Sequence, residues 1–178
     1  MFSYLHIKSE LAKKLLISAL AVISAIILPQ LCHAAGVLTG TGAKLGSILL
    51  PMHIPVILAG FFGGAIVGGV TGILSPIISF AISGMPTAAL LPFMIIELTV
   101  YGIVSGLLSK KKINSILKVT IVLLCGRIAR SLAVVTSIYA LGNEKLAITS
   151  AYMFIIEGII GTLIQLVVIP FIISRKKA

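Results

Sequence analysis

The feature that most constrains this fold is the length of the uncharged segments. Residues 45–83 contain no Asp, Glu, Lys or Arg over 39 positions. About 20 residues are enough for a helix to cross the hydrocarbon core of a bilayer, so this run is too long for one helix. It therefore predicts two helices, and the natural break is the glycine-rich "GFFGG" of residues 60–64.

The rest of the chain divides in the same way, because apolar segments of helix length alternate with short polar or basic stretches. We predict an all-α integral membrane protein, a six-transmembrane-helix bundle that forms a single domain over residues 1–178. Residues 33–45 are predicted to form a long outer loop after the first helix. The six spans are expected at about residues 13–32, 46–62, 64–83, 88–108, 115–141 and 148–173.

Composition supports a membrane protein and argues against a nucleic-acid partner. Hydrophobic residues make up 59% of the chain and charged residues 10%, whereas a soluble domain usually carries about 25% charged residues. There is too little polar surface to cover a soluble globule. The formal net charge is +10, but most basic residues flank apolar runs instead of forming a patch on a polar domain. We therefore expect no nucleic-acid binding.

Lysine and arginine are distributed unequally between the loops. If the N-terminus lies in the cytoplasm, ten basic residues fall inside and only Lys44 and Lys145 fall outside. Such a bias follows the positive-inside rule. It predicts that both termini are cytoplasmic and that the protein is a multi-pass protein of the cell membrane. The ten are Lys8, Lys13, Lys14, Lys110, Lys111, Lys112, Lys118, Arg175, Lys176 and Lys177.

The first apolar segment also admits a second interpretation. "KKLLISALAVISAIILPQLCHAAG" has the basic start, apolar centre and small-residue end of a secretory signal. Cleavage would leave five spans. The six-span count favours an uncleaved first helix.

Ionisable residues inside the predicted spans are candidates for a binding site. Glu97, Glu157, Arg127, Arg130 and His53 are expected on four helices, at comparable depth in the outer half of the membrane. The two arginines are spaced i, i+3 and share a helix face, so two acids and two guanidiniums can neutralise each other. Ionisable groups within a membrane are costly and usually functional. The alternative is a set of buried salt bridges that only fixes helix packing.

The surroundings of Glu97 and His53 suggest a cavity for a small molecule. Tyr101 follows Glu97 by four residues, on the same helix face, and can stack on a ring or donate a hydrogen bond; ordinary packing is the alternative. His53 lies between Pro51 and Pro55, which disturb the helix and free backbone carbonyls. Irregular backbone persists in membranes where it lines a cavity or is covered by protein.

The sequence gives no sign of catalysis, metal binding or a cofactor. It has no Asp, no His-Glu-x-x-His and no Gly-x-Ser-x-Gly. Cys32 and Cys125 are far apart in the sequence and form no Cys-x-x-Cys pair, so we interpret both as packing residues. We expect a protein that is not an enzyme.

The chain resembles a known family, the substrate-binding S components of energy-coupling factor (ECF) vitamin transporters. The resemblance rests on six short helices, an Ala21-x-x-x-Ala25 pattern in the first helix, and the stretches "LLPMHIPVILAGFFGG" and "LPFMIIELTVYGIVSGLL". The two stretches are similar to a subgroup of which some members are described as pantothenate-type. The likeness spans nearly the whole chain.

The resemblance implies a mechanism and partners. Family members bind a vitamin near the outer surface under the loop that follows the first helix, here residues 33–45, whose glycines suit a flexible lid. They then dock on a transmembrane coupling subunit driven by two ATPases. Ala21 and Ala25 match the docking motif. This chain has no Walker-type phosphate loop, so ATP must be used by the partners.

The sequence is compatible with several ligands and several functions. The candidate ligand-binding residues are Glu97, Arg127, Arg130, Glu157, His53 and Tyr101. Guanidiniums favour a carboxylate, such as that of a pantothenate-like vitamin. If the acids already neutralise the arginines, a pyridoxine or a pyrimidine precursor of thiamine fits equally well. The alternatives are a stand-alone proton-coupled secondary transporter and a structural membrane subunit.

Overall fold

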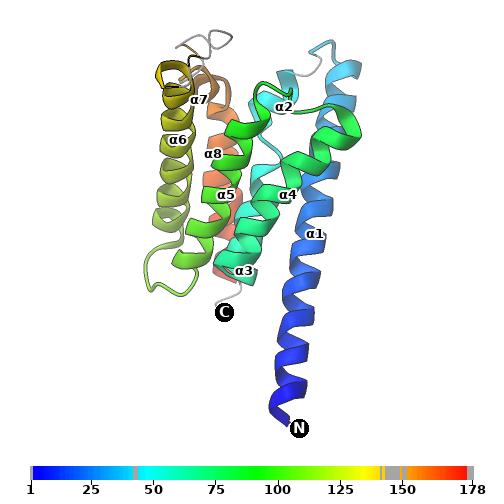
Figure 1. Ribbon diagram of the computed structural model, residues 1–178, viewed down its shortest axis with the longest axis vertical. Coiled ribbons are helices and arrows are strands. Elements are labelled where there is room, and N and C mark those ends of the chain that lie inside the picture. The colour runs from blue at the N-terminus through cyan, green and yellow to red at the C-terminus, as the bar shows by residue number, and fades with distance from the viewer. Residues whose placement is uncertain (1, 42–43, 141, 143–148, 150–151, 176–178) are drawn as a thin grey trace.

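The computed structural model describes residues 2–41, 44–140, 142, 149 and 152–175. In these residues the regular elements are all helices, and they run side by side (Figure 1). The start of α1 and the end of α8 lie at the same end of the molecule (Figure 1). The elements are α1 (Phe2–Leu38), α2 (Lys44–Leu49), α3 (His53–Gly63), α4 (Ala65–Ser83), α5 (Leu91–Leu108), α6 (Ser115–Tyr139), α7 (Met153–Glu157) and α8 (Ile159–Arg175).

Four of the described helices are long and apolar enough to cross a membrane. They are Ser9–Leu38 within α1, and the whole of α4, α5 and α6. Two shorter apolar helices, α3 and α8, accompany them. The prediction of an all-α, multi-pass membrane protein is confirmed in this form, while the count of six spans and the orientation of the termini stay predictions.

The first helix is longer than predicted, at the expense of the outer loop. α1 continues to Leu38, so the first part of the loop predicted at residues 33–45 is helical. The segment after Cys32 is apolar and contains no proline, which allows the helix to continue. The helix gives way to a turn at Gly40, whose φ is +73°, a backbone angle that glycine adopts without steric cost. Residues 42–43 lie outside the described part of the chain.

Two predicted spans are interrupted. The span expected at 46–62 consists of α2 and α3, separated by a turn in which Leu50 has φ +51° and Pro51 follows. The span expected at 148–173 consists of α7 and α8, with a break at Gly158. The predicted ends at residues 141 and 148 lie outside the described residues.

The break inside the long uncharged run falls where the glycines predict it. α3 ends at Gly63 and α4 begins at Ala65, because Gly64 has φ +89°. The neighbouring glycines bring α4 and α5 into backbone contact. A Cβ atom added to Gly102 would collide with the backbone of Gly68, and one added to Gly72 would lie 2.5 Å from the carbonyl oxygen of Leu98. Small residues at this interval permit such close approach.

α5 lies at the centre of the bundle and positions the candidate site. It packs against α3, α4 and α6. Its buried face carries Glu97 and Tyr101, so these polar groups cannot face lipid. α1 packs against α3 and α4 and extends past the ends of the other helices at its N-terminal end (Figure 1).

Candidate functional site

Four ionisable or polar side chains surround Glu97 and form with it what we call the Glu97 cluster: Glu97, His53, Tyr101, Arg127 and Arg130. Glu97 is completely buried. Arg130 Nη1 donates to Glu97 Oε2 at 2.7 Å, and Arg127 Nη1 lies 3.2 Å from Oε1. The Tyr101 hydroxyl donates to Oε1 at 2.8 Å. The carboxylate therefore has partners for both oxygens, as a charge inside a membrane requires.

Helix periodicity explains how three helices supply the cluster. Tyr101 lies one turn after Glu97 on α5, and Arg127 and Arg130 lie on one face of α6. His53 opens α3, and its Nε2 is 3.7 Å from Glu97 Oε1. That separation is too long for a hydrogen bond, so His53 borders the carboxylate without binding it.

The two guanidiniums have further contacts on the C-terminal helices. The guanidinium carbon of Arg130 lies 4.2 Å from the centre of the Phe154 ring, and that of Arg127 lies 5.2 Å from it. Arg127 Nη2 also donates to Thr162 Oγ1 at 3.2 Å. Cation–π contact stabilises a guanidinium that has left water. α7 and α8 therefore add contacts that hold the arginines in place.

Glu157 does not play the predicted neutralising role. It lies on α7 with an exposed side chain, and it forms no ion pair with any described residue. Both arginines pair with Glu97 instead. The expected pairing of two acids with two guanidiniums is therefore wrong in this structure, because α7 ends at Gly158 and places Glu157 at the rim of the bundle.

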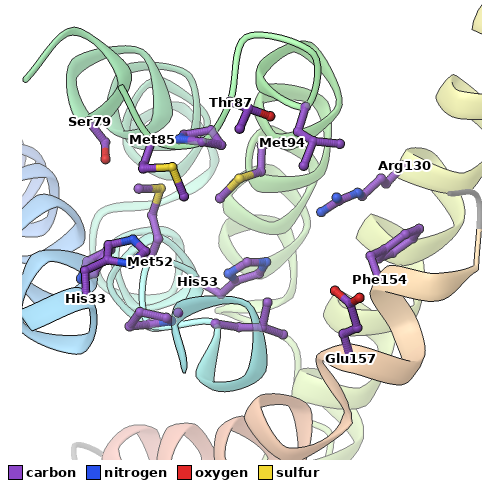
Figure 2. Close-up of a pocket in the computed structure, with 16 residues that line it drawn as sticks. His33, Met52, His53, Ser79, Met85, Thr87, Met94, Arg130, Phe154 and Glu157 are labelled. Atoms are coloured by element: carbon purple, nitrogen blue, oxygen red, sulfur yellow. The ribbon is translucent and has the colours of Figure 1, made fainter. Parts of the chain in front are cut away.

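A pocket of about 190 Å³ lies beside the cluster, at the end of the bundle opposite the termini. His53 and Arg130 belong to both the pocket and the cluster, and Glu157 lines the pocket as well. Figure 2 shows these three side chains around one space, with Met52, Met85 and Met94 across from Arg130. Tyr101 and Arg127 do not line it. The predicted site thus divides into a pocket wall and a set of residues behind it.

Three nitrogens of two pocket-lining residues have no hydrogen-bond partner. His53 Nδ1, His53 Nε2 and Arg130 Nε are buried and unpaired, and His53 as a whole is only 1% exposed. Buried polar groups almost always have a partner, and leaving one without costs about 1–3 kcal/mol. All three belong to residues that line the pocket. A small movement of either side chain would bring an arginine N–H donor or an imidazole nitrogen to a bound molecule.

A family model described as ECF transporter, substrate-specific component, matches residues 13–173. The match covers most of the chain. The chain belongs to this family. No match was found among curated proteins or among solved structures.

The resemblance stated from the sequence is thereby confirmed, and with it the transport class. This S component is a transport subunit and not an enzyme. S components of the family work with a transmembrane coupling component and ATPases. In the described residues no group of three or more His, Cys, Asp or Glu side chains is arranged to hold a metal ion, and the two cysteines are free thiols.

The two alanines of the predicted docking motif occupy different environments in the S component. Ala25 is fully buried in the main hydrophobic cluster, together with residues of α3 such as Val56. Ala21 is half-buried. One turn before Ala21, Ser18 Oγ lies 3.2 Å from Thr71 Oγ1 of α4. With α1 packed as it is here, Ala25 offers no surface to a partner.

Several wall residues of the S component have no distinctive sequence signal. His33, Met85, Thr87 and Phe154 line the pocket, but each is a single residue in an apolar or loop segment. Ser79 of α4 also lines it, and a serine in an apolar helix is an equally weak signal. The only local signal concerns Met85 and Thr87, which follow the end of α4 at Gly84, whose φ is +70°.

Proposed function

We propose that this S component captures a small water-soluble vitamin or vitamin precursor in the pocket beside the Glu97 cluster. The observation that carries the proposal is a pocket of about 190 Å³ whose lining includes His53 and Arg130, two residues with buried nitrogens that have no hydrogen-bond partner. A space that served packing alone would be apolar and dry. A pocket with a few convergent polar groups is the usual form of a small-molecule site.

Size and lining favour a ligand built on one ring. A cavity of about 150 Å³ holds a benzene molecule, so this pocket suits one substituted ring. Methionine sulfur packs well against aromatic rings, and Met52, Met85 and Met94 lie on one side of the pocket. A pyridoxine or a pyrimidine precursor of thiamine satisfies both conditions.

A pantothenate-like carboxylate is the second candidate. Arg130 favours it because guanidinium groups bind carboxylates. Both guanidiniums already pair with Glu97 in this structure, however, so a carboxylate would compete with Glu97 or rely on Arg130 Nε alone. The pairing therefore favours a neutral ring.

The direction of transport follows from the distribution of charge. The pocket lies at the end opposite the termini and the Lys110–Lys112 segment. If the lysine-rich end is cytoplasmic, the pocket opens toward the outside of the cell membrane. Gly46 and Leu50, in and just after α2, form part of its wall, so movement of α2 can admit the ligand. Release inside then depends on the coupling subunit and two ATPases. Of the two predicted docking residues, Ala21 is accessible to a partner and Ala25 is buried in this arrangement of α1.

Ligand identification is the direct test. The protein is purified in mild detergent, denatured, and the released small molecules are identified by mass spectrometry. Calorimetric titration with pyridoxine, the hydroxymethyl pyrimidine of thiamine and pantothenate then ranks the candidates. We expect submicromolar binding of one single-ring compound by the protein alone. No binding of any of the three, together with no co-purified molecule, would contradict the proposal and favour a structural subunit.

Uptake assays in liposomes distinguish an S component from a stand-alone transporter. We expect no uptake by the purified protein under a proton gradient, and ATP-dependent uptake only when the coupling subunit and ATPases are present. Gradient-driven uptake by the protein alone would show a secondary transporter.

A further inference from the structure

A second pocket, of about 560 Å³, lies at the opposite end of the bundle from the ligand pocket. Its wall includes residues of α1, the junction of α3 and α4, the end of α5, and α6. Neither the Glu97 cluster nor the proposed transport mechanism uses it. We call it the lysine pocket, after Lys14, Lys110 and Lys118 in its wall.

The charges of the lysine pocket are mainly positive. Three lysines face one acid, Glu10. The ammonium group of Lys13, which is outside the wall, donates to Glu10 at 2.9 Å and partly neutralises it. Lys118 is only 2% exposed, and its Nζ donates to the carbonyl oxygen of Ser109 at 3.0 Å. Its ammonium group is therefore fixed in the wall, while Lys14 and Lys110 are exposed at the rim.

Apart from Ser109, the rest of the wall is apolar. Phe61 and Phe62 at the end of α3 are half-buried, and Ile173 of α8 is buried. A pocket for a free inorganic anion has no need of such a surface. Cations at the rim and aromatic or aliphatic groups below match a molecule with an anionic head and an apolar body.

The lysine pocket also lies at the depth of lipid headgroups. α5 has 18 residues, so it is about 27 Å long at 1.5 Å per residue, close to the hydrocarbon thickness of about 30 Å. Ser109 and Lys110 follow its last residue and therefore reach the headgroup region. On the α1 side, Leu11 and Leu15 are 56% and 63% exposed, so this side of the pocket borders lipid.

We propose that the lysine pocket binds the phosphate headgroup of an anionic phospholipid from the leaflet at the lysine-rich end. Basic pockets between transmembrane helices bind such headgroups through the ammonium groups. Lys14 and Lys110 contact the phosphate, Lys118 adds a fixed charge, and the first acyl carbons lie on Phe61 and Phe62. The bound lipid links α1 to the α5–α6 connection. The site is independent of the vitamin pocket.

Native mass spectrometry of the full chain in detergent tests the proposal, with short-chain phosphatidylglycerol as the probe. We expect one phosphatidylglycerol bound in preference to phosphatidylcholine of equal chain length. Lys14→Gln/Lys110→Gln should weaken this binding at least fivefold. Both lysines are exposed, so the double variant should fold, which circular dichroism checks.

The matched control is Lys111→Gln/Lys112→Gln. It removes the same charge from adjacent exposed positions that are not in the wall, and we expect it to bind phosphatidylglycerol like the wild-type protein. Equal loss in both double variants would overturn the proposal in favour of diffuse surface attraction. Equal binding of phosphatidylcholine, or displacement by inorganic phosphate at the concentration of the lipid, would overturn it in favour of an apolar groove or a small-anion site.

Discussion

The two ends of this bundle hold their charged side chains in opposite ways. In the Glu97 cluster, two guanidiniums and a tyrosine hydroxyl converge on one fully buried carboxylate. At the lysine-rich end, Lys13 and Glu10 form an ion pair whose side chains are 67% and 47% exposed. The first group is fixed by the fold, and the second remains in contact with water or lipid headgroups. Lys118 is the exception at the lysine-rich end, because it is buried and donates to the Ser109 carbonyl oxygen.

The difference teaches which charges can define a binding site. Buried charges must be paired, so their positions are determined by the helices, and a pocket beside them has a rigid wall. Exposed pairs contribute about 0–1 kcal/mol and can rearrange. A selective ligand site is therefore expected at the Glu97 cluster, and a site for an abundant lipid at the lysine-rich end.

Removing Glu97 should have the largest effect. Glu97→Ala leaves two buried guanidiniums without their acid, and breaking a buried ion pair costs about 3–5 kcal/mol. We expect a large drop in the melting temperature in detergent and at least tenfold weaker ligand binding. Glu97→Gln keeps the shape and should lose nearly as much stability. An unchanged melting temperature in both variants would show that the Glu97 cluster contributes no more to stability than the exposed ion pair at the lysine-rich end.

Variants of Arg130 and Arg127 distinguish a residue that lines the pocket from one that lies behind its wall. Arg130 lines the pocket and Arg127 does not. We expect Arg130→Gln to weaken ligand binding at least tenfold, and Arg127→Gln to weaken it by about threefold while it lowers stability. Calorimetric titration and thermal unfolding of the same samples provide both values. A larger affinity loss for Arg127→Gln would place the ligand deeper than the pocket described.

Variants of His53 and Tyr101 make the same distinction between a wall residue and a residue behind the wall, with smaller expected effects. His53→Phe removes both unpaired ring nitrogens, and we expect about tenfold weaker binding, since a hydrogen bond to the ligand lost at a buried site costs about 1–3 kcal/mol. Tyr101→Phe removes only the bond to Glu97 at 2.8 Å, behind the wall. It should lower stability by about 1 kcal/mol and leave affinity within twofold. Equal affinity loss in both would contradict the division into wall and support.

The exposed pair should give the smallest effect. Lys13→Gln removes the ion pair with Glu10, and we expect less than about 1 kcal/mol of stability change and no change in ligand affinity. Thermal unfolding at low and high salt checks this. A loss comparable to that of Glu97→Ala would mean that the lysine-rich end is as rigid as the Glu97 cluster.

The sequence was sufficient for the membrane class, the helical fold and the family. Uncharged runs and flanking lysines mark positions along the membrane normal, so the break at Gly64 and the depth shared by Glu97 and the two arginines could be predicted. The i, i+3 spacing of Arg127 and Arg130 fixed their common face, and the i, i+4 spacing placed Tyr101 beside Glu97. These predictions depend only on local geometry.

The tertiary structure alone decided which groups meet. Hydropathy sets the depth of a residue but not the rotation of its helix or the identity of its neighbour. For that reason the sequence could not tell that both arginines pair with Glu97, that Glu157 lies at the rim, or that Ala25 faces the core. The lining of the pocket comes from each of the helices α1 to α7, and no single segment carries its signature.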